Sequence, residues 1–491
     1  MIKIIIIAIF IAIQVAVGIY SVRKIKNIDD FLLGGRKMGA WLSALAYGTS
    51  YFSAVIFIGY AGGIGWEMGT SAVWIGIGNA VAGSYLAWRV LAKRTRSITR
   101  ELDAKTMPEF FQKRYDSEAL KIFTSVLTFI FLVPYTASVY KGLGYLFSKL
   151  FPASVSVSQA FTITVIIMAA FTLIYLVLGG YIATALNNLI QGTIMIIGTV
   201  IIVVYVVKSP EVNGFANGLA SLNNIKEGLG TITGPDPWKL LSLVLITSFG
   251  VWGLPQMVHK FYAIKDESSI KKGTIIATVF AAVIGIGAYL TGSFGRLFFS
   301  EIPNGSVDTI VPNMLVKILP DAFLGIFMVL ILAASMSTLS SLVLVSASSI
   351  SVDLVKGYIK KDMSEKSQLT LFRILCGVFV VISVIMALMN NNAIVTLMNL
   401  SWGTLAGCFL GPYVVGIYSR RADKVSAFAG MLSGFTVMMT LVIIKGMTYS
   451  TVAGCIAMAT SVAVSFIVSR LSWKKNITVE EILNEKVVTG E

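Results

Sequence analysis

Apolar segments of about 20 residues recur along the whole chain, and this pattern constrains the fold more than any single motif. Each segment is long enough to cross a bilayer as a helix. Of the 491 residues, 56% are hydrophobic and only 13% are charged, which is typical of an all-α polytopic membrane protein. We expect thirteen spans, at about 3–21, 40–68, 71–90, 122–148, 158–178, 189–207, 240–258, 273–298, 322–350, 370–389, 394–418, 425–444 and 451–469.

The basic residues alternate sharply between the two sets of connectors. Of the 39 Lys and Arg residues, 30 follow spans one, three, seven, nine and eleven or lie in the C-terminal tail. Eight lie on the other side, and Lys141 alone falls well inside a span. The positive-inside rule then predicts a protein of the cytoplasmic membrane with its N-terminus outside and its C-terminus in the cytoplasm. The net charge of +15 is thus an orientation signal, and nucleic acid is excluded as a partner.

Catalytic and metal-binding chemistry finds little support. The chain has one histidine, His259, at the expected cytoplasmic end of span seven, and three scattered cysteines, Cys376, Cys408 and Cys455. These give neither a disulfide framework nor a nucleophile–base pair, so we do not expect an enzyme. The N-terminus lacks a cleavage signal and is expected to remain as a helix. No obligate protein partner is indicated.

Span nine contains an unusual concentration of hydroxyl groups. Eight of the eighteen residues in Leu332–Ser349 are Ser or Thr. Any one of them can bond to a carbonyl one turn back. Ala334, Ser337 and Thr338, however, follow the i, i+3, i+4 spacing that places residues on one helix face. A carbonyl and two hydroxyls there suit a small cation, provided that a second helix adds two more oxygens.

Two other spans are expected to be discontinuous. Span two is rich in small and polar residues from Gly48 to Gly63, and span seven contains Gly250, Gly253 and Pro255. Proline removes a helical hydrogen bond, so a break near Pro255 is expected. Interrupted helices at corresponding positions of two halves indicate an inverted-repeat transporter with a site near the membrane midplane.

The repeats then define the domain organisation. We expect a peripheral N-terminal helix and first cytoplasmic loop (1–39), an inverted-repeat core (40–424), two peripheral helices (425–469) and a cytoplasmic tail (470–491). Repeat one spans about 40–207 and repeat two about 239–418.

Lys141 is a functional candidate because ionisable residues are costly deep in a membrane. It lies in span four together with Tyr135 and Tyr140. The alternative is a lysine that extends to the outer surface or lies at a helix end.

Three motifs resemble those of the sodium:solute symporter family: Ile28–Gly39, Gly179–Gly192 and above all AASMSTLSSLVLVSASSISVDL at Ala333–Leu354. Within the family, Gly253–Asp266 and Asp308–Pro320 are most similar to the pantothenate and monocarboxylate permeases. The resemblance implies a leucine-transporter-like 5+5 inverted repeat.

The resemblance also implies a sodium site. Matched position by position, its ligands are the carbonyls of Thr49 and Phe52, the carbonyl of Ala334, and the hydroxyls of Ser337 and Thr338. The last three are the group that spacing had selected.

Several positions depart from the family pattern. Tyr51 replaces an aspartate of the sodium/proline symporter, and Asn188 replaces an aspartate of the inner connector that is linked to the ion pathway. Thr247 and Val251 replace aromatic residues. These changes argue against proline as the solute, and Lys141 favours a small organic anion. The candidate substrate-binding residues are Ser50, Tyr51, Ser53, Tyr135, Tyr140, Lys141, Trp252 and Pro255.

We therefore expect a secondary transporter that couples sodium entry to uptake of a small organic solute, with a carboxylate favoured. One alternative keeps the fold but makes the carrier proton-coupled or sodium-independent, with the Lys141 ammonium in place of sodium. A membrane sensor is a less favoured alternative, because the tail after Leu471 contains no kinase-like domain. A channel is less favoured still.

Overall fold

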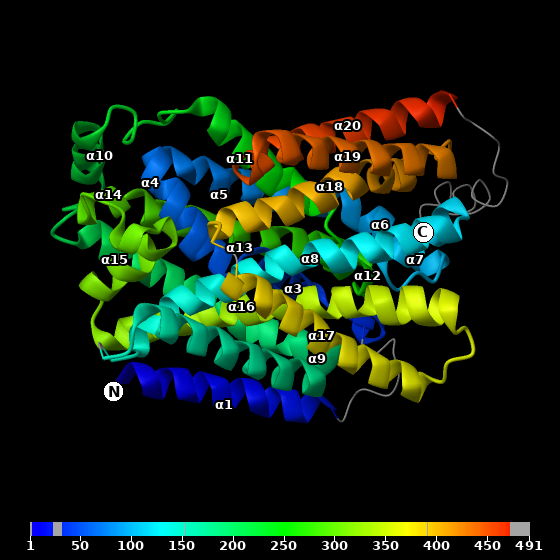
Figure 1. The fold of residues 1–491 in the computed structure, drawn as a ribbon, viewed down its shortest axis with the longest axis horizontal. Helices are drawn as coiled ribbons and strands as arrows, with labels where there is room; N and C mark the ends of the chain where they lie inside the picture. Colours follow the sequence, from blue (N-terminus) through cyan, green and yellow to red (C-terminus); the bar gives the residue numbers. More distant parts are fainter. Residues whose placement is uncertain (1, 23–31, 153, 390, 472–491) are drawn as a thin grey trace.

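The computed structural model consists of helices that run side by side along the long axis of the molecule (Figure 1). It describes residues 2–22, 32–152, 154–389 and 391–471, without the side chains of 18, 20–22 and 175–183. The first part of the Ile28–Gly39 motif, part of the Gly179–Gly192 connector and nearly all of the predicted tail therefore lie outside the described side chains. Every named element in the described part of the chain is helical.

The longer elements have the following bounds: α1 Ile2–Val22, α3 Ala40–Tyr51, η2 Val55–Ile64, α4 Gly65–Met68, α5 Val73–Ala80, η4 Val81–Leu86, α6 Lys93–Glu101, α7 Met107–Tyr115, α8 Glu118–Phe147, α9 Val157–Lys208, α10 Phe215–Ile225, α11 Pro237–Phe249, α12 Pro255–Tyr262, α13 Glu267–Ser293, α14 Gly295–Phe298, α15 Ile310–Ile318, α16 Asp321–Ser348, η10 Ser349–Ile359, α17 Glu365–Met389, α18 Ile394–Tyr418, α19 Lys424–Lys445 and α20 Ser450–Leu471. The short helical turns are η1 Gly34–Arg36, η3 Gly69–Ala72, η5 Trp88–Ala92, η6 Ser148–Leu150, η7 Gly250–Trp252, η8 Pro303–Gly305, η9 Val307–Thr309 and η11 Met447–Tyr449.

Nine helices of the described chain are long and apolar enough to cross a membrane, or up to eleven if each of two bent pairs counts as one span. The thirteen predicted spans are therefore not confirmed as a number. The predicted spans at 40–68 and 71–90 both fall within one bent pair, Ala40–Tyr51 with Val55–Glu101. Predicted span one corresponds to a shorter apolar helix, Ile2–Val17. The all-helical, multi-pass class is confirmed.

The burial of the helices separates a core from a periphery. The apolar windows of α16 and α18 are 83% buried inside the protein, whereas those of α17, α19 and α20 are only 28–33% buried. Helices that are apolar on all sides suit the centre of a bundle, and helices with one exposed apolar side suit contact with lipid. The hydroxyl-rich segment on α16 thus lies in the interior of the protein.

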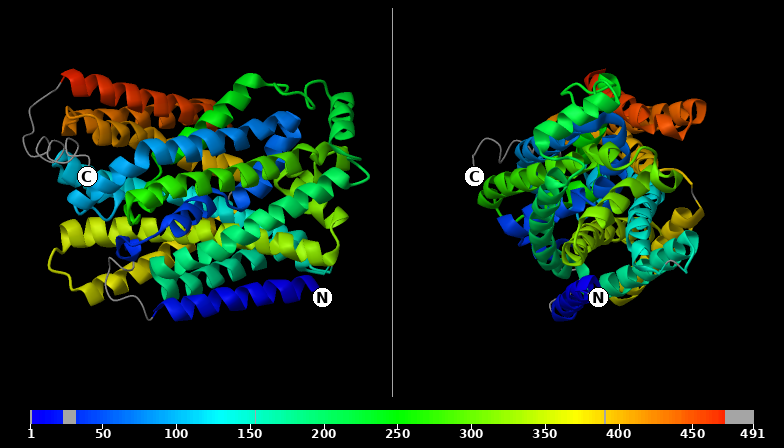
Figure 2. Two further views of the ribbon diagram at one scale, coloured as in Figure 1. Left: turned by 180° about the vertical axis from the view of Figure 1, so that it is seen from behind. Right: turned by 90° about the vertical axis from the view of Figure 1, so that its left-hand side faces the viewer.

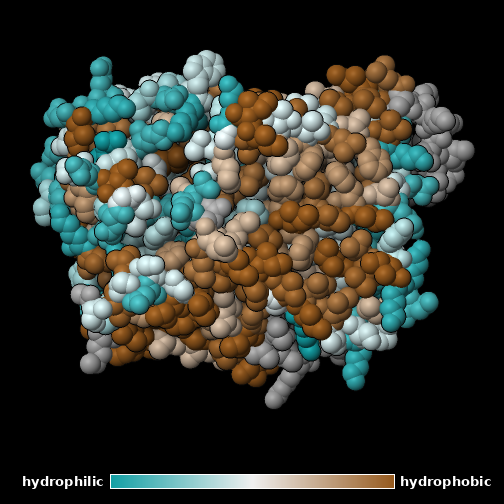
Figure 3. All heavy atoms as spheres, in the orientation of Figure 1, coloured by the Kyte–Doolittle hydropathy of each residue, from teal (hydrophilic) through white to brown (hydrophobic). Residues whose placement is uncertain are grey.

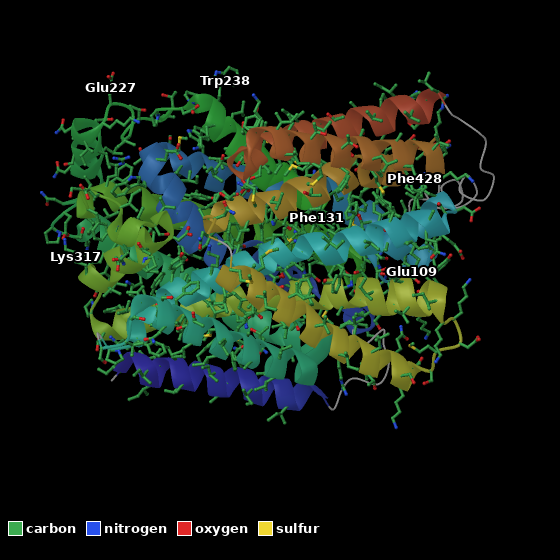
Figure 4. The ribbon with its side chains drawn as sticks, viewed as in Figure 1. Glu109, Phe131, Glu227, Trp238, Lys317 and Phe428 are labelled. Atoms are coloured by element: carbon green, nitrogen blue, oxygen red, sulfur yellow. The ribbon has the colours of Figure 1, made fainter. Side chains whose placement is uncertain are left out.

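The bundle has two polar ends and an apolar middle. The space-filling view shows hydrophilic residues gathered at the left and right ends, with hydrophobic residues between them (Figure 3). Glu227 and Lys317 lie toward one end, and Glu109 lies toward the other (Figure 4). Helix α1 begins at the first end and α20 finishes at the second, as both side views show (Figures 1 and 2). A membrane would therefore surround the middle of the bundle, with the helices crossing it lengthwise.

Candidate functional site

The first broken helix has its break at Phe52 and Ser53. Helix α3 ends at Tyr51, and Phe52 adopts an extended conformation (φ −106°, ψ 113°). The helical path resumes at Val55 with a bend of 44°. Ser53 begins the second half, because its hydroxyl accepts the N–H of Val55 (3.2 Å) and its carbonyl accepts that of Ile56 (3.0 Å). The carbonyl of Phe52 is consequently left out of the helical ladder, since Ile56 would have been its donor.

The second broken helix has its break where Pro255 predicted it. Helix α11 and the short turn η7 end at Trp252, Leu254 is extended, and Pro255 is the first residue of α12. The two parts are bent by 42°. Proline suits a first helical position because it has no N–H to leave unpaired. Both interruptions predicted from the sequence are confirmed.

A cluster of oxygen atoms joins the first broken helix to α16. The hydroxyl of Ser337 donates to the hydroxyl of Thr49 at 2.7 Å. The hydroxyl of Thr338 lies 3.4 Å from the carbonyl of Thr49, 3.3 Å from that of Ser50 and 3.1 Å from that of Ala334. All five residues are buried. The structure thus brings four predicted sodium ligands together, and places the fifth, Phe52, at the adjacent break.

This cluster has the chemistry that a small hard cation requires. Its oxygens are uncharged hydroxyls and carbonyls, and the Thr338 hydroxyl has three acceptors at rather long distances instead of one at a short distance. Oxygens about 3.4 Å apart can lie about 2.4 Å from a shared cation, the range known for calcium, an ion of similar size. The residues present therefore fit a sodium ion.

An aromatic group surrounds the break in α3. The ring of Tyr51 lies 6.1 Å from that of Trp402 on α18, and the ring of Tyr135 on α8 lies 5.8 Å from the same indole. The hydroxyl of Tyr51 donates to the carbonyl of Thr247 on α11 (2.6 Å). Ser53 is buried beside them. Trp402 was not predicted as a site residue; the sequence SWGTLAG reads equally well as a helix-packing motif.

Other predicted substrate residues lie in different surroundings. The indole N–H of Trp252 donates to the carbonyl of Ala82 (3.0 Å), so this side chain is directed toward η4. Tyr140 is fully buried on α8, and Pro255 is buried at the start of α12. Ser50 bonds to the hydroxyl of Ser341 (2.9 Å), one turn beyond Ser337 on α16.

Lys141 lies near residues of the connectors at one end of the bundle. Its ammonium donates to the carbonyl of Asn392 (2.5 Å), and it is close enough to Asp308 for their charges to interact. Asp308 is buried in η9, where one carboxylate oxygen accepts the N–H of Ile394 (3.1 Å). Burial raises the pKa of Asp308 to about 6. The structure thus does not join Lys141 to the Thr49–Thr338 cluster.

Asn188 is buried on α9, and neither polar atom of its side chain has a hydrogen-bond partner in the part of the chain that is described. One turn later, the position of Gly192 lies against Leu45 and Thr49 of α3, 3.1–3.3 Å from their side chains. Residues four apart share a helix face, so Asn188 lies on the side of α9 that faces α3. An unpartnered buried amide there is compatible with a role near the ion pathway.

Lys260 is a functional candidate that the sequence analysis did not identify. We had assigned it to the connector after span seven, but α12 continues to Tyr262 and Lys260 is buried. His259, predicted at a span end, is also part of this buried helix. The helix restarts at Pro255, which carries it beyond the apolar segment. A lysine between Val258 and Phe261 in this restarted helix was the available signal.

A helical membrane protein with two broken helices beside a buried oxygen cluster belongs to the class of multi-pass membrane transporters. A model of the sodium:solute symporter family matches residues 31–434, and the chain belongs to this family. The osmoregulated proline transporter of Bacillus subtilis is 30% identical over 431 residues, which cover 85% of this chain and 84% of that protein. The sodium/proline symporter of Escherichia coli is 29% identical over 440 residues, or 86% and 84% of the two chains.

Solved structures agree on the fold. A Na+-coupled sialic acid symporter in a substrate-bound outward-open state aligns with a TM-score of 0.79 and 18% identity, covering 96% of this chain and 98% of that one. MhsT in complex with L-phenylalanine aligns with a TM-score of 0.56 and 15% identity over 88% and 99% of the chains. The chain thus has the helical fold of these transporters, and its family places it in a cell membrane.

Proposed function

We propose that this protein is a sodium-coupled symporter that carries a small organic solute with a carboxylate group into the cell. The observation that supports it best is the contact of Ser337 and Thr338 with Thr49, because it places hard oxygens of α16 against a broken helix. Family membership supports sodium as the coupling ion.

In this proposal the sodium ligands are the carbonyls of Thr49, Phe52 and Ala334 and the hydroxyls of Ser337 and Thr338. Binding would join α3 and α16 more firmly than the present hydroxyl contacts do. The membrane potential contributes about 2.3 kcal/mol per charge per 100 mV, so one sodium ion supports roughly fiftyfold accumulation of a neutral solute. This direction requires the orientation predicted from the Lys and Arg residues, with the N-terminus outside.

The solute site would lie at the breaks, among Tyr51, Ser53, Tyr135 and Trp402. The second halves of both broken helices begin there, and a helix N-terminus carries partial positive charge that favours a carboxylate. Proline and sialic acid, which the names of the relative and the structural neighbour specify, both carry one. The two breaks would occupy corresponding positions in repeats of about 40–207 and 239–418.

The alternative in which Lys141 replaces the coupling ion receives less support. Its ammonium is bonded to Asn392 and faces Asp308, away from the hydroxyl cluster of α16. We therefore propose that Lys141 belongs to the outer side of the transport path and does not bind the solute's carboxylate.

Uptake into proteoliposomes tests the function. A panel of labelled carboxylates would be offered with sodium and proton gradients imposed separately, using native protein, Ser337→Ala and Thr338→Ala. We expect each variant to need at least about fivefold more sodium for half-maximal uptake, because one of five ligands is lost. Ser335→Ala is the matched control, since Ser335 is buried on another face of α16. Unchanged sodium dependence in both site variants would refute the assignment.

A further inference from the structure

The side chain of Lys260 reaches from the second broken helix to α16. Its ammonium donates a 2.8 Å hydrogen bond to the hydroxyl of Ser341. Lys260 is only 3% exposed and Ser341 2%, so this contact is shielded from bulk water. A positive charge in such a place interacts strongly with other charges nearby, because the effective dielectric constant is low.

Ser341 connects this ammonium to the proposed sodium ligands. Its hydroxyl lies 3.0 Å from the carbonyl of Ser337 and 2.9 Å from the hydroxyl of Ser50. Ser337 supplies one sodium ligand, and Ser50 follows Thr49, which supplies another. The lysine is therefore separated from two ligand residues by a single serine hydroxyl.

The elements packed against α12 determine what else could compensate this charge. They are α3, α6, α7, α16 and η7. Carboxylates on them are Glu101, Glu109 and Asp321, and of these Asp321 begins α16 some five turns before Ser341. Their basic groups, with those of α12 itself, are more numerous: Lys93, Arg94, Arg96, Arg100, Lys113, Arg114 and His259.

We propose that Lys260 is a fixed cation of the coupling site that sets its sodium affinity. This inference rests on the proposed sodium site. The ammonium and a sodium ion on Thr49, Ser337 and Thr338 repel one another, so Lys260 keeps sodium binding weak enough for release. It also occupies the hydroxyl of Ser341, which is then not available to a second ion.

Sodium titration of purified protein tests this without relying on transport. The readout is the sodium-dependent rise in unfolding temperature, with choline holding ionic strength constant. Lys260→Gln retains an amide donor for Ser341 but has no charge, whereas Lys260→Arg keeps the charge. We expect half-saturation to fall at least about tenfold in Lys260→Gln and to stay within about threefold of native in Lys260→Arg. Lys265→Gln, on the exposed connector beyond α12, is the control and should match native.

Two further variants keep the outcome decisive. If Lys260→Gln does not fold, the pair Lys260→Met and Ser341→Ala removes the charge together with its acceptor, and should show the same tenfold fall relative to Ser341→Ala alone. Native-like half-saturation in the uncharged variants, with a shifted value in Thr338→Ala, would overturn this inference alone. An unshifted value in Thr338→Ala would instead overturn the proposed sodium site.

Discussion

The hydroxyl of Tyr51 donates a 2.6 Å hydrogen bond to the backbone carbonyl of Thr247, which joins the two broken helices close to the point where each first half ends. Both residues depart from the family pattern, one toward a larger side chain and one toward a smaller side chain. The large side chain thus comes from α3 and the space for it from α11. This exchange reshapes the region between the breaks, where we place the solute.

Removing this bond should affect the solute more than the fold. Tyr51→Phe is expected to lower the free energy of unfolding by about 1 kcal/mol, as for a typical buried hydrogen bond. It should also raise the KM for the transported solute severalfold, since the relative position of the broken helices changes. Tyr47→Phe is the matched control, because Tyr47 lies one turn earlier and donates to the carbonyl of Gly83 (2.5 Å). An equal rise in KM in both variants would contradict a specific role for Tyr51.

Asp308 should make stability depend on pH. Burial raises its pKa to about 6, compared with about 3.9 in an unfolded chain. Between these values the folded protein retains a proton that the unfolded chain has lost, so stability is greatest below pH 4 and falls as the pH rises toward 6. The difference corresponds to up to about 3 kcal/mol.

Asp308→Asn should therefore remove this loss and raise the unfolding temperature at pH 7, measured in detergent at a series of pH values from 4 to 7. Glu301→Gln, in an exposed part of the same connector, is the control and should retain the native pH profile. A native profile in Asp308→Asn would show that another group is responsible.

Cysteine labelling tests the proposed orientation. Cys376, Cys408 and Cys455 would first be replaced, because they are the three native thiols. Single cysteines at the exposed positions Asn223 and Asn304 are expected to react with an impermeant reagent on intact cells. A cysteine at Ser364 should react only after permeabilisation. The opposite pattern would place the N-terminus in the cytoplasm and reverse the proposed direction of sodium entry.

The sequence predicted those parts of the site that depend on local spacing. Ala334, Ser337 and Thr338 share a face because a helix repeats every 3.6 residues, and Pro255 interrupts a helix wherever it occurs in the interior. Both effects are properties of the chain itself. The contact of Thr338 with Thr49 was expected only through the resemblance to known transporters, since it joins residues 289 positions apart.

Lys141 and Lys260 show what spacing could not resolve. Both are lysines in apolar surroundings, and their roles depend on which distant residues they contact. Lys141 meets Asn392 and Asp308 from connectors, whereas Lys260 meets Ser341 in the core. The number of spans was also uncertain, because broken helices divide apolar segments in ways that a hydropathy pattern does not separate.

The inner beginning of α3 and the end of α12 are linked by the backbone alone. The N–H of Met38 bonds to the carbonyl of Ala263 (3.1 Å), and the N–H of Lys265 bonds to the carbonyl of Met38 (2.9 Å). Arg96 and Arg100 cover the neighbouring carbonyls of Ile264 and Lys265. Because no side chain makes this pair of bonds, ordinary substitutions preserve it, and the two broken helices are held together at one end like the arms of a pair of tweezers. Any change of their separation must therefore occur beyond the breaks, so that access to the solute is regulated from the free ends of the arms.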